Sequence, residues 1–278
     1  MNVTLCTALS IAVLYVSDIV SGLALLYFGF DIGYYQGLYS MATSVLGISF
    51  LLIISRFAGM FLFKTGGDLI RVSVPRISMI LFGIAMGLAL LAFVTTYMRF
   101  ARIISEYLDS MKESVQEYSD HIKTYDDEII YPVWDQILYI ISLIVIVPFE
   151  EEIAFRGIAY GSISKVFSPG IAAVISAVLF GILHGVSLHI GYAIIAGLFM
   201  ALTYYAYDNL IVSVIVHSVF NFFGSGLYYI SELTGFDTQQ LFGLYTIQFM
   251  MTVPALFFLA KKIYLKNHGQ EETANEQA

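Results

Sequence analysis

The chain lacks most of the features that a soluble protein of its length carries. Only 12% of its 278 residues are charged, against about 25% in soluble domains. It has one cysteine, Cys6, which excludes an internal disulfide and any metal site built from several thiolates. With 13 Lys and Arg against 21 Asp and Glu, the net charge is -8. No basic patch is present that could bind nucleic-acid phosphates, so we expect no nucleic-acid partner.

Hydrophobic sequence is what the chain has in excess. Hydrophobic residues make up 59% of the chain, and the mean hydropathy is +0.81. Eight apolar stretches approach the ~20 residues that a membrane-spanning helix needs. Their runs are continuous rather than alternating, which argues against a β-barrel. The sequence therefore predicts an all-α fold, a polytopic integral membrane helical bundle of about eight transmembrane helices. The predicted spans are 4–29, 37–63, 77–98, 132–156, 169–188, 190–207, 210–230 and 241–260.

The predicted spans fall into two groups separated by a polar segment. Three leading spans occupy residues 1–98, and five more form a core over residues 132–265. We interpret the first stretch as a retained membrane anchor, because no basic segment or cleavage site accompanies it. The polar segment 99–131 is predicted to form an amphipathic helix outside the membrane or along its surface. The acidic tail, residues 266–278, is predicted to be disordered.

The positions of Lys and Arg predict the orientation. With eight spans, both termini lie on one face, and that face would carry eight basic residues against four on the other. Because cytoplasmic loops carry the excess of Lys and Arg, we expect both termini in the cytoplasm, in the cell membrane if the organism is a prokaryote. The eight are Lys64, Arg71, Arg76, Arg156, Lys165, Lys261, Lys262 and Lys266, and the four are Arg99, Arg102, Lys112 and Lys123.

Charged residues at the end of the fourth predicted span are the first candidates for a functional site. A charge at the bilayer centre costs about 2.5 kcal/mol or more, yet Glu150, Glu151 and Glu152 are consecutive there. Glu152 and Arg156 are four residues apart with the acid first, so a helix would pair them. Glu151 points about 100° away from Glu152 on a helix and has no basic partner in its own segment. The alternative is a charge cluster at a helix end.

Two later spans carry further polar residues at helical spacing. His184 follows Phe180 by one turn in an otherwise apolar stretch, and His217 and Asn221 share one helix face. Each motif alone is also compatible with packing: a hydrogen bond between membrane helices contributes only ~0.6 kcal/mol on average. If the three faces meet, they enclose a carboxylate, two imidazoles and an amide. Those groups can activate a water and stabilise an oxyanion.

The three motifs, Glu-Glu-x-x-x-Arg, Phe-x-x-x-His and His-x-x-x-Asn, resemble those of the CaaX-protease and bacteriocin-processing family in order and spacing. This family, also called Abi, includes the type II CaaX prenyl proteases, and the resemblance covers about residues 132–230. It implies an intramembrane endopeptidase that works on membrane-associated peptides or lipidated proteins within membrane lipid. Prenylated C-termini, bacteriocin leaders and signalling peptides all remain open as substrates.

The resemblance also implies roles for single residues. Glu151 and His184 would polarise the attacking water, and His217 and Asn221 would stabilise the oxyanion. Glu152 and Arg156 would hold the fourth helix in place, supported by Phe180. The implied mechanism is that of a glutamate protease without metal, so we expect no cofactor. The two histidines lie on separate spans, unlike those of zincins, although a zinc site from Glu and both histidines stays open as an alternative.

Two other functions fit the composition. A catalytically silent immunity or regulatory protein of the same fold would not need all four proposed catalytic positions, and this chain retains them. A transporter with a proton relay would show an internal repeat with broken helices, and none is found. One geometric requirement follows for the protease. Glu151 near the end of its span and His184 late in its own can meet at one depth only if the fifth helix starts later, tilts, or is preceded by a re-entrant piece around residues 157–168.

Overall fold

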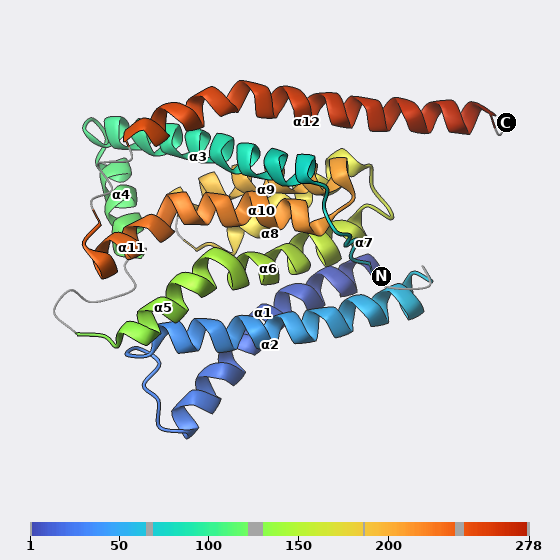
Figure 1. Cartoon of the computed structure of the whole chain (residues 1–278). Helices are drawn as coiled ribbons and strands as arrows, with labels where there is room; N and C mark the ends of the chain where they lie inside the picture. Colours follow the sequence, from blue (N-terminus) through green and yellow to red (C-terminus); the bar gives the residue numbers. More distant parts are fainter. Residues whose placement is uncertain (1, 65–68, 122–129, 186, 237–241, 277–278) are drawn as a thin grey trace.

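The computed structural model describes residues 2–64, 69–121, 130–185, 187–236 and 242–276. Throughout that part of the chain the regular elements are helices, which confirms the all-α prediction (Figure 1). They are α1 (Asn2–Tyr27), α2 (Gln36–Phe57), η1 (Ala58–Leu62), α3 (Ile77–Ser105), α4 (Asp109–His121), α5 (Val133–Ile141), η2 (Ser142–Ile146), α6 (Val147–Glu152), η3 (Ile153–Tyr160), α7 (Gly161–Ile163), α8 (Pro169–Ile182), α9 (Ser187–Tyr207), α10 (Leu210–Asn221), η4 (Phe222–Gly226), α11 (Leu227–Thr234) and α12 (Phe242–Glu276), where η marks π-helical turns.

Within the described residues, six helices are long and apolar enough to cross a membrane. The chain is therefore a polytopic membrane bundle, but the predicted count of eight is not confirmed. The two predicted spans that are not among the six are 132–156 and 169–188, and α8, in the second, has only 14 residues. The six are Asn2–Tyr27, Gln36–Leu62, Ile77–Ser105, Ser187–Tyr207, Leu210–Thr234 and Thr246–His268.

The fourth predicted span is longer than the sequence indicated. Helical backbone runs without a break from Val133 to Ile163, through α5, η2, α6, η3 and α7. A re-entrant piece around 157–168, one of the three ways considered for bringing Glu151 and His184 to one depth, is therefore not found over the first half of that segment, since Gly157 and Gly161 are helical and the turn to α8 follows Ile163. Both glycines pack against other segments of the chain, Gly157 closely against Ile70. As a result, Glu151 lies well inside a helix rather than at its end.

The fifth predicted span ends earlier than expected. α8 stops at Ile182, so His184 lies in the turn that leads to α9 and not late in a helix. Gly185 adopts a φ of +82°, a conformation that glycine adopts without steric cost and that commonly follows a helix end. Gly181, by contrast, remains helical and lies against Ile190 and Ile194 of α9. The long fourth helix and this early turn together bring Glu151 and His184 to the same cavity.

Two polar segments contain more helix than predicted. α3 continues to Ser105, and α4 then presents half-buried residues at helical spacing, among them Met111, Val115 and Tyr118. α4 packs on α9, while residues 122–129 of the predicted polar segment, including Lys123, lie outside the described part. The tail 266–278, predicted to be disordered, is helical as far as Glu276. Its Gln, Glu and Ala residues are good helix formers.

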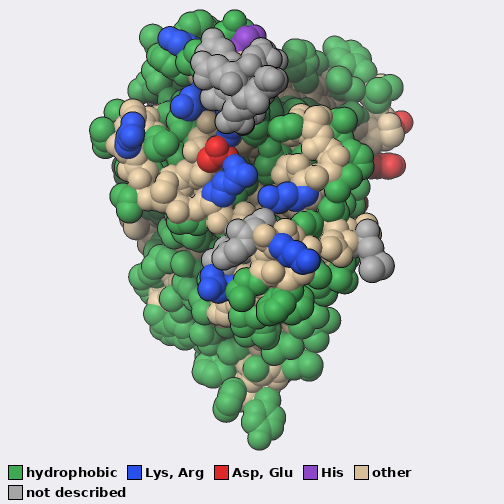
Figure 2. Space-filling model, turned by 90° about the vertical axis from the view of Figure 1, so that its right-hand side faces the viewer, with side chains coloured by type: hydrophobic (Ala, Val, Ile, Leu, Met, Phe, Trp, Pro, Cys, Tyr) green, Lys and Arg blue, Asp and Glu red, His purple; other side chains and the backbone are tan. Residues whose placement is uncertain are grey.

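The helices lie in layers that enclose one region around α8, α9 and α10 (Figure 1). α3 packs between α12 and α10, and α1 and α2 lie on the other side against the helix that contains α5 and α6. Both termini lie toward the right-hand side of Figure 1, and Lys and Arg side chains gather on that face (Figure 2). Arg156 is not among them, because its side chain is fully buried; its place in the orientation count was wrong.

Candidate active site

The three consecutive glutamates of α6 point in three directions. Glu150 is 5% exposed and faces α2, where a Cβ on Gly47 would lie 1.8 Å from its Oε1. Glu152 is fully buried on another side of the helix, whereas the Glu151 side chain is 22% exposed and lines a cavity. Successive residues of a helix are separated by about 100° around its axis, which explains why the three side chains point to different sides of α6. Only Glu151 of the three can meet a substrate.

Glu152 and Arg156 form an ion pair between two fully buried side chains, as their spacing predicts. Arg156 Nη1 lies 3.0 Å from Glu152 Oε1, and Nη2 donates to the Gly197 carbonyl at 3.1 Å. The guanidinium also lies 4.5 Å from the Phe180 ring centroid. Arg156 thereby connects the fourth helix to α9 and α8.

The Glu152 carboxylate also holds His217. Nδ1 of His217 lies 3.1 Å from Glu152 Oε1, and the Ser213 hydroxyl donates to Oε2. A carboxylate paired with Arg156 accepts hydrogen bonds, so Nδ1 of His217 carries the proton. The ring is then oriented with Nε2 3.6 Å from Glu151 Oε2. Ser213, one turn before His217 on α10, was not identified from the sequence, although its i,i+4 spacing is the signal that could have shown it.

His184 is held by the backbone of its own segment. Nδ1 lies 2.8 Å from the Phe180 carbonyl oxygen, which can only accept, so Nδ1 is the donor. In the neutral ring Nε2 is then the acceptor. The Phe180 ring lies between the two imidazoles, with centroids 4.5 Å from His184 and 5.9 Å from His217. Phe180 is buried, at 2% exposure, and supports both rings.

Asn221 is oriented by an irregularity in the fourth helix. Its Nδ2 donates to the Leu143 carbonyl at 2.9 Å. Leu143 lies in η2, where the Val147 N–H bonds to Ser142, five residues earlier. In that pattern the partner of Leu143 would be residue 148, which is Pro148 and has no N–H. The carbonyl that proline leaves open is thus satisfied by Asn221, and the second Nδ2 hydrogen is still available.

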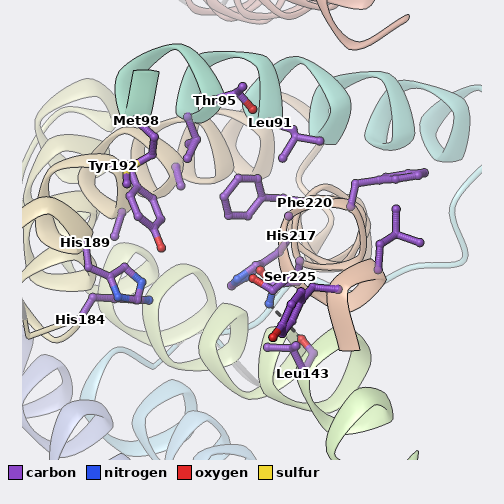
Figure 3. Close-up of a pocket in the computed structure, with 18 of the residues that line it drawn as sticks. Leu91, Thr95, Met98, Leu143, His184, His189, Tyr192, His217, Phe220 and Ser225 are labelled. Atoms are coloured by element: carbon purple, nitrogen blue, oxygen red, sulfur yellow. Dashed lines mark hydrogen bonds between the residues drawn. The ribbon is translucent and has the colours of Figure 1, made fainter. Parts of the chain in front are cut away.

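One cavity of about 750 Å³ brings the four predicted residues together. Glu151, His184, His217 and Asn221 all line it, and Figure 3 shows His184 on one wall and His217 across from it. Its other lining residues come mainly from α3, α9 and the α10–α11 region. They include Leu91, Val94, Thr95, Met98, Arg99, Arg102, Tyr118, Tyr139, Leu143, Val147, Phe180, His189, Tyr192, Phe220, Phe223, Tyr228, Tyr229 and Gln248.

An aromatic group beside His184 was missed by sequence reasoning. The His189 ring lies 4.6 Å from His184 and stacks on Tyr192 at 4.8 Å, with 23° between the planes. Tyr118 of α4 meets both edge-on, and its hydroxyl lies 3.4 Å from that of Tyr192. A second histidine shortly after His184 was the available signal. The polar segment that contains Tyr118 gave none.

The described part of the chain was also compared with the alternative that the site binds a metal ion. No three His, Cys, Asp or Glu side chains there are grouped so that they could hold a metal ion. His217 contacts both Glu151 and Glu152, but Glu152 is already committed to Arg156 and Ser213. Zinc held by Glu151, His184 and His217 therefore stays an alternative to the mechanism without metal.

Residues 133–223 match the family described as type II CAAX prenyl endopeptidase, Rce1-like. The matched segment contains all four cavity residues singled out above, together with Glu152, Arg156 and Phe180. No significant match was found among curated proteins or among solved structures. The resemblance inferred from the three motifs is therefore confirmed by an independent comparison over the same part of the chain.

Proposed function

We propose, from the match of residues 133–223 to the type II CAAX prenyl endopeptidases, that this protein is an intramembrane endopeptidase. Its substrate would be a membrane-associated peptide or a lipidated protein. One observation carries the proposal: a carboxylate from α6, an imidazole from the turn after α8, and an imidazole and an amide from α10 line a single cavity in a membrane bundle. Placing ionisable side chains inside a membrane bundle costs free energy, so a group of them around one cavity indicates a functional site.

In this proposal Glu151 and His184 activate the attacking water. His184 donates through Nδ1 to Phe180, so its Nε2 lone pair can accept a proton from a water in the cavity. The partly exposed Glu151 carboxylate can accept a hydrogen bond from the second O–H of that water, which stays on the nucleophile. A base must lie within hydrogen-bond reach of the proton that it removes, so the proposal requires the water to bind between these two side chains in the cavity that both of them line. The water oxygen then attacks the peptide carbonyl carbon, and the proton held by His184 passes to the amine nitrogen as the peptide C–N bond breaks.

His217 and Asn221 are proposed to stabilise the oxyanion that forms. Asn221 can supply the Nδ2 hydrogen that Leu143 does not use. His217 already donates through Nδ1, so it can donate through Nε2 only when both ring nitrogens are protonated. Donors fixed before the reaction are the largest single contribution in many hydrolases.

Glu152 and Arg156 are positioning residues in this mechanism. Neither lines the cavity, yet Glu152 fixes the His217 ring and Arg156 fixes Glu152. Ser213 completes the same network from α10. Zinc is assigned no part, and no cofactor is proposed.

Both termini are proposed to lie in the cytoplasm. Basic side chains gather on the face toward which both termini point (Figure 2). That distribution is typical of the cytoplasmic side.

A trapping experiment tests the function. The Glu151→Gln protein is expressed in its host beside wild type and beside Glu113→Gln, an exposed position on α4. Peptides that accumulate uncut only with Glu151→Gln, and that copurify with it, would be the substrates. If wild type and all variants give the same membrane peptides, the protein acts as a silent binding or regulatory protein instead.

A further inference from the structure

One face of α3 changes from apolar to cationic along the cavity. Leu91, Val94, Thr95 and Met98 line it first, followed by Arg99 and Arg102. These residues follow Leu91 by three, four, seven, eight and eleven positions, which places them on one side of the helix. Both arginines are exposed, which places them at the open end. The cavity wall therefore ends in two guanidinium groups about one turn apart.

The distance between this cationic end and the proposed catalytic groups can be worked out from helix packing. Gly87 of α3 lies against Val219, and Leu91 lies near Gly224, so α3 and α10 run in the same direction. His217 and Asn221 are thus level with residues 87–91. At 1.5 Å per residue, Arg99 and Arg102 lie roughly 12 and 16 Å beyond Leu91. Helical side chains lean toward the N-terminus, so both guanidinium groups lean back toward Asn221.

The charges on the cavity wall are arranged at opposite ends. Glu151 is the only acidic residue among the described residues that line the cavity. Neither Arg99 nor Arg102 forms an ion pair with any residue in the described part of the chain. Arg presents a planar fork that matches a carboxylate with two hydrogen bonds. Arginines at a membrane edge also bind lipid headgroups, but here both line the cavity that holds the proposed catalytic groups.

We propose that Arg99 and Arg102 form a subsite that binds a carboxylate of the substrate peptide. This inference rests on the proposed protease function and specifies the kind of substrate. An extended peptide covers about 3.3–3.6 Å per residue. Counted from the level of residues 87–91, the separation is roughly 12–22 Å, which corresponds to about three to seven extended residues. The carboxylate, from a chain terminus or an acidic side chain, lies that far from the bond to be cut.

The test uses three farnesylated peptides in which the cysteine is followed by three apolar residues. One ends in a free carboxylate, one in an amide, and one in an amide with a glutamate added before it. Binding is measured to the Glu151→Gln protein in vesicles of phosphatidylcholine, with and without phosphatidylglycerol. Cleavage by wild type is measured in parallel. The variants are Arg99→Gln with Arg102→Gln, and Lys112→Gln as a control that removes an exposed charge outside the cavity.

We expect the carboxylate peptide to bind about tenfold more tightly than the plain amide. That preference should fall below about twofold in the double arginine variant and stay unchanged in Lys112→Gln, with thermal stability unaltered in both. The glutamate peptide decides whether an acidic side chain can replace the terminus. Equal binding of all three peptides, or a preference that follows the phosphatidylglycerol content alone, overturns the subsite. If wild type cleaves none of the peptides while the preference for the carboxylate peptide is still found, the result counts against the protease proposal but not against the subsite.

Discussion

Two neighbouring glutamates should respond in opposite ways to the same conservative substitution. Glu152 is fully buried and is held by Arg156 at 3.0 Å, by His217 at 3.1 Å and by Ser213. Glu152→Gln leaves the buried Arg156 charge without its counter-ion, which costs about 3–5 kcal/mol of unfolding free energy. Glu151 is partly exposed and lies 3.6 Å from His217. Glu151→Gln should change the unfolding free energy by about 1 kcal/mol or less, while abolishing proteolysis.

The assay is reversible unfolding in mixed micelles, followed by the fluorescence of Trp134 and by circular dichroism. A third variant, Glu152→Gln with Arg156→Met, removes both charges of the pair. Replacing a whole buried ion pair by uncharged groups is often close to neutral, so this variant should recover part of the lost stability. Equal unfolding free energies for Glu151→Gln and Glu152→Gln would refute the reasoning. So would a Glu151→Gln protein that cleaves substrate at the wild-type rate.

Three further outcomes follow from the contacts. Asn221→Ala should lower turnover about a hundredfold or more and cost about 1 kcal/mol through its bond to Leu143; a change of less than threefold in turnover counts against the oxyanion role. Gly87→Ala should lower the unfolding free energy by about 1–3 kcal/mol, because the added Cβ would lie 2.7 Å from Val219. Gly170→Ala is the control: its Cβ would meet nothing within 4 Å, so the same unfolding assay should show no loss of stability. A reporter enzyme that works only in the cytoplasm should be active when fused to the C-terminus, and a reporter that works only outside the cytoplasm should be inactive there. The opposite result would mean that the orientation is reversed.

The membrane fold and the helix-face pairs were accessible from the sequence because each depends on local pattern. Long apolar runs predicted the spans, and i,i+4 spacing predicted that Glu152 would meet Arg156. The same spacing predicted that His217 and Asn221 would share a face. What spacing does not show is which groups from other helices complete each contact. The spacing of Ser213 places it on the face of His217, but it does not show that the Ser213 hydroxyl donates to Glu152.

The path of the chain between the fourth and fifth spans could not be predicted. Glycines at 157 and 161 suggested a break, because glycine lowers helix propensity. In the structure their small size serves packing against residues 69–70, and tertiary contacts keep the helix intact. The orientation of Asn221 likewise depends on a π-helical turn and on Pro148, and a hydropathy pattern carries no information about either.

The most direct test of the central claim is proteolysis by purified protein after removal of metal. Wild type, Glu151→Gln and His184→Ala are treated with a strong chelator, dialysed, checked for zinc by elemental analysis, and incubated with the trapped substrate in vesicles. The proposed mechanism predicts unchanged cleavage by zinc-free wild type and none by either folded variant. Stoichiometric zinc whose removal abolishes wild-type cleavage and whose return restores it, or cleavage by Glu151→Gln, would contradict the account.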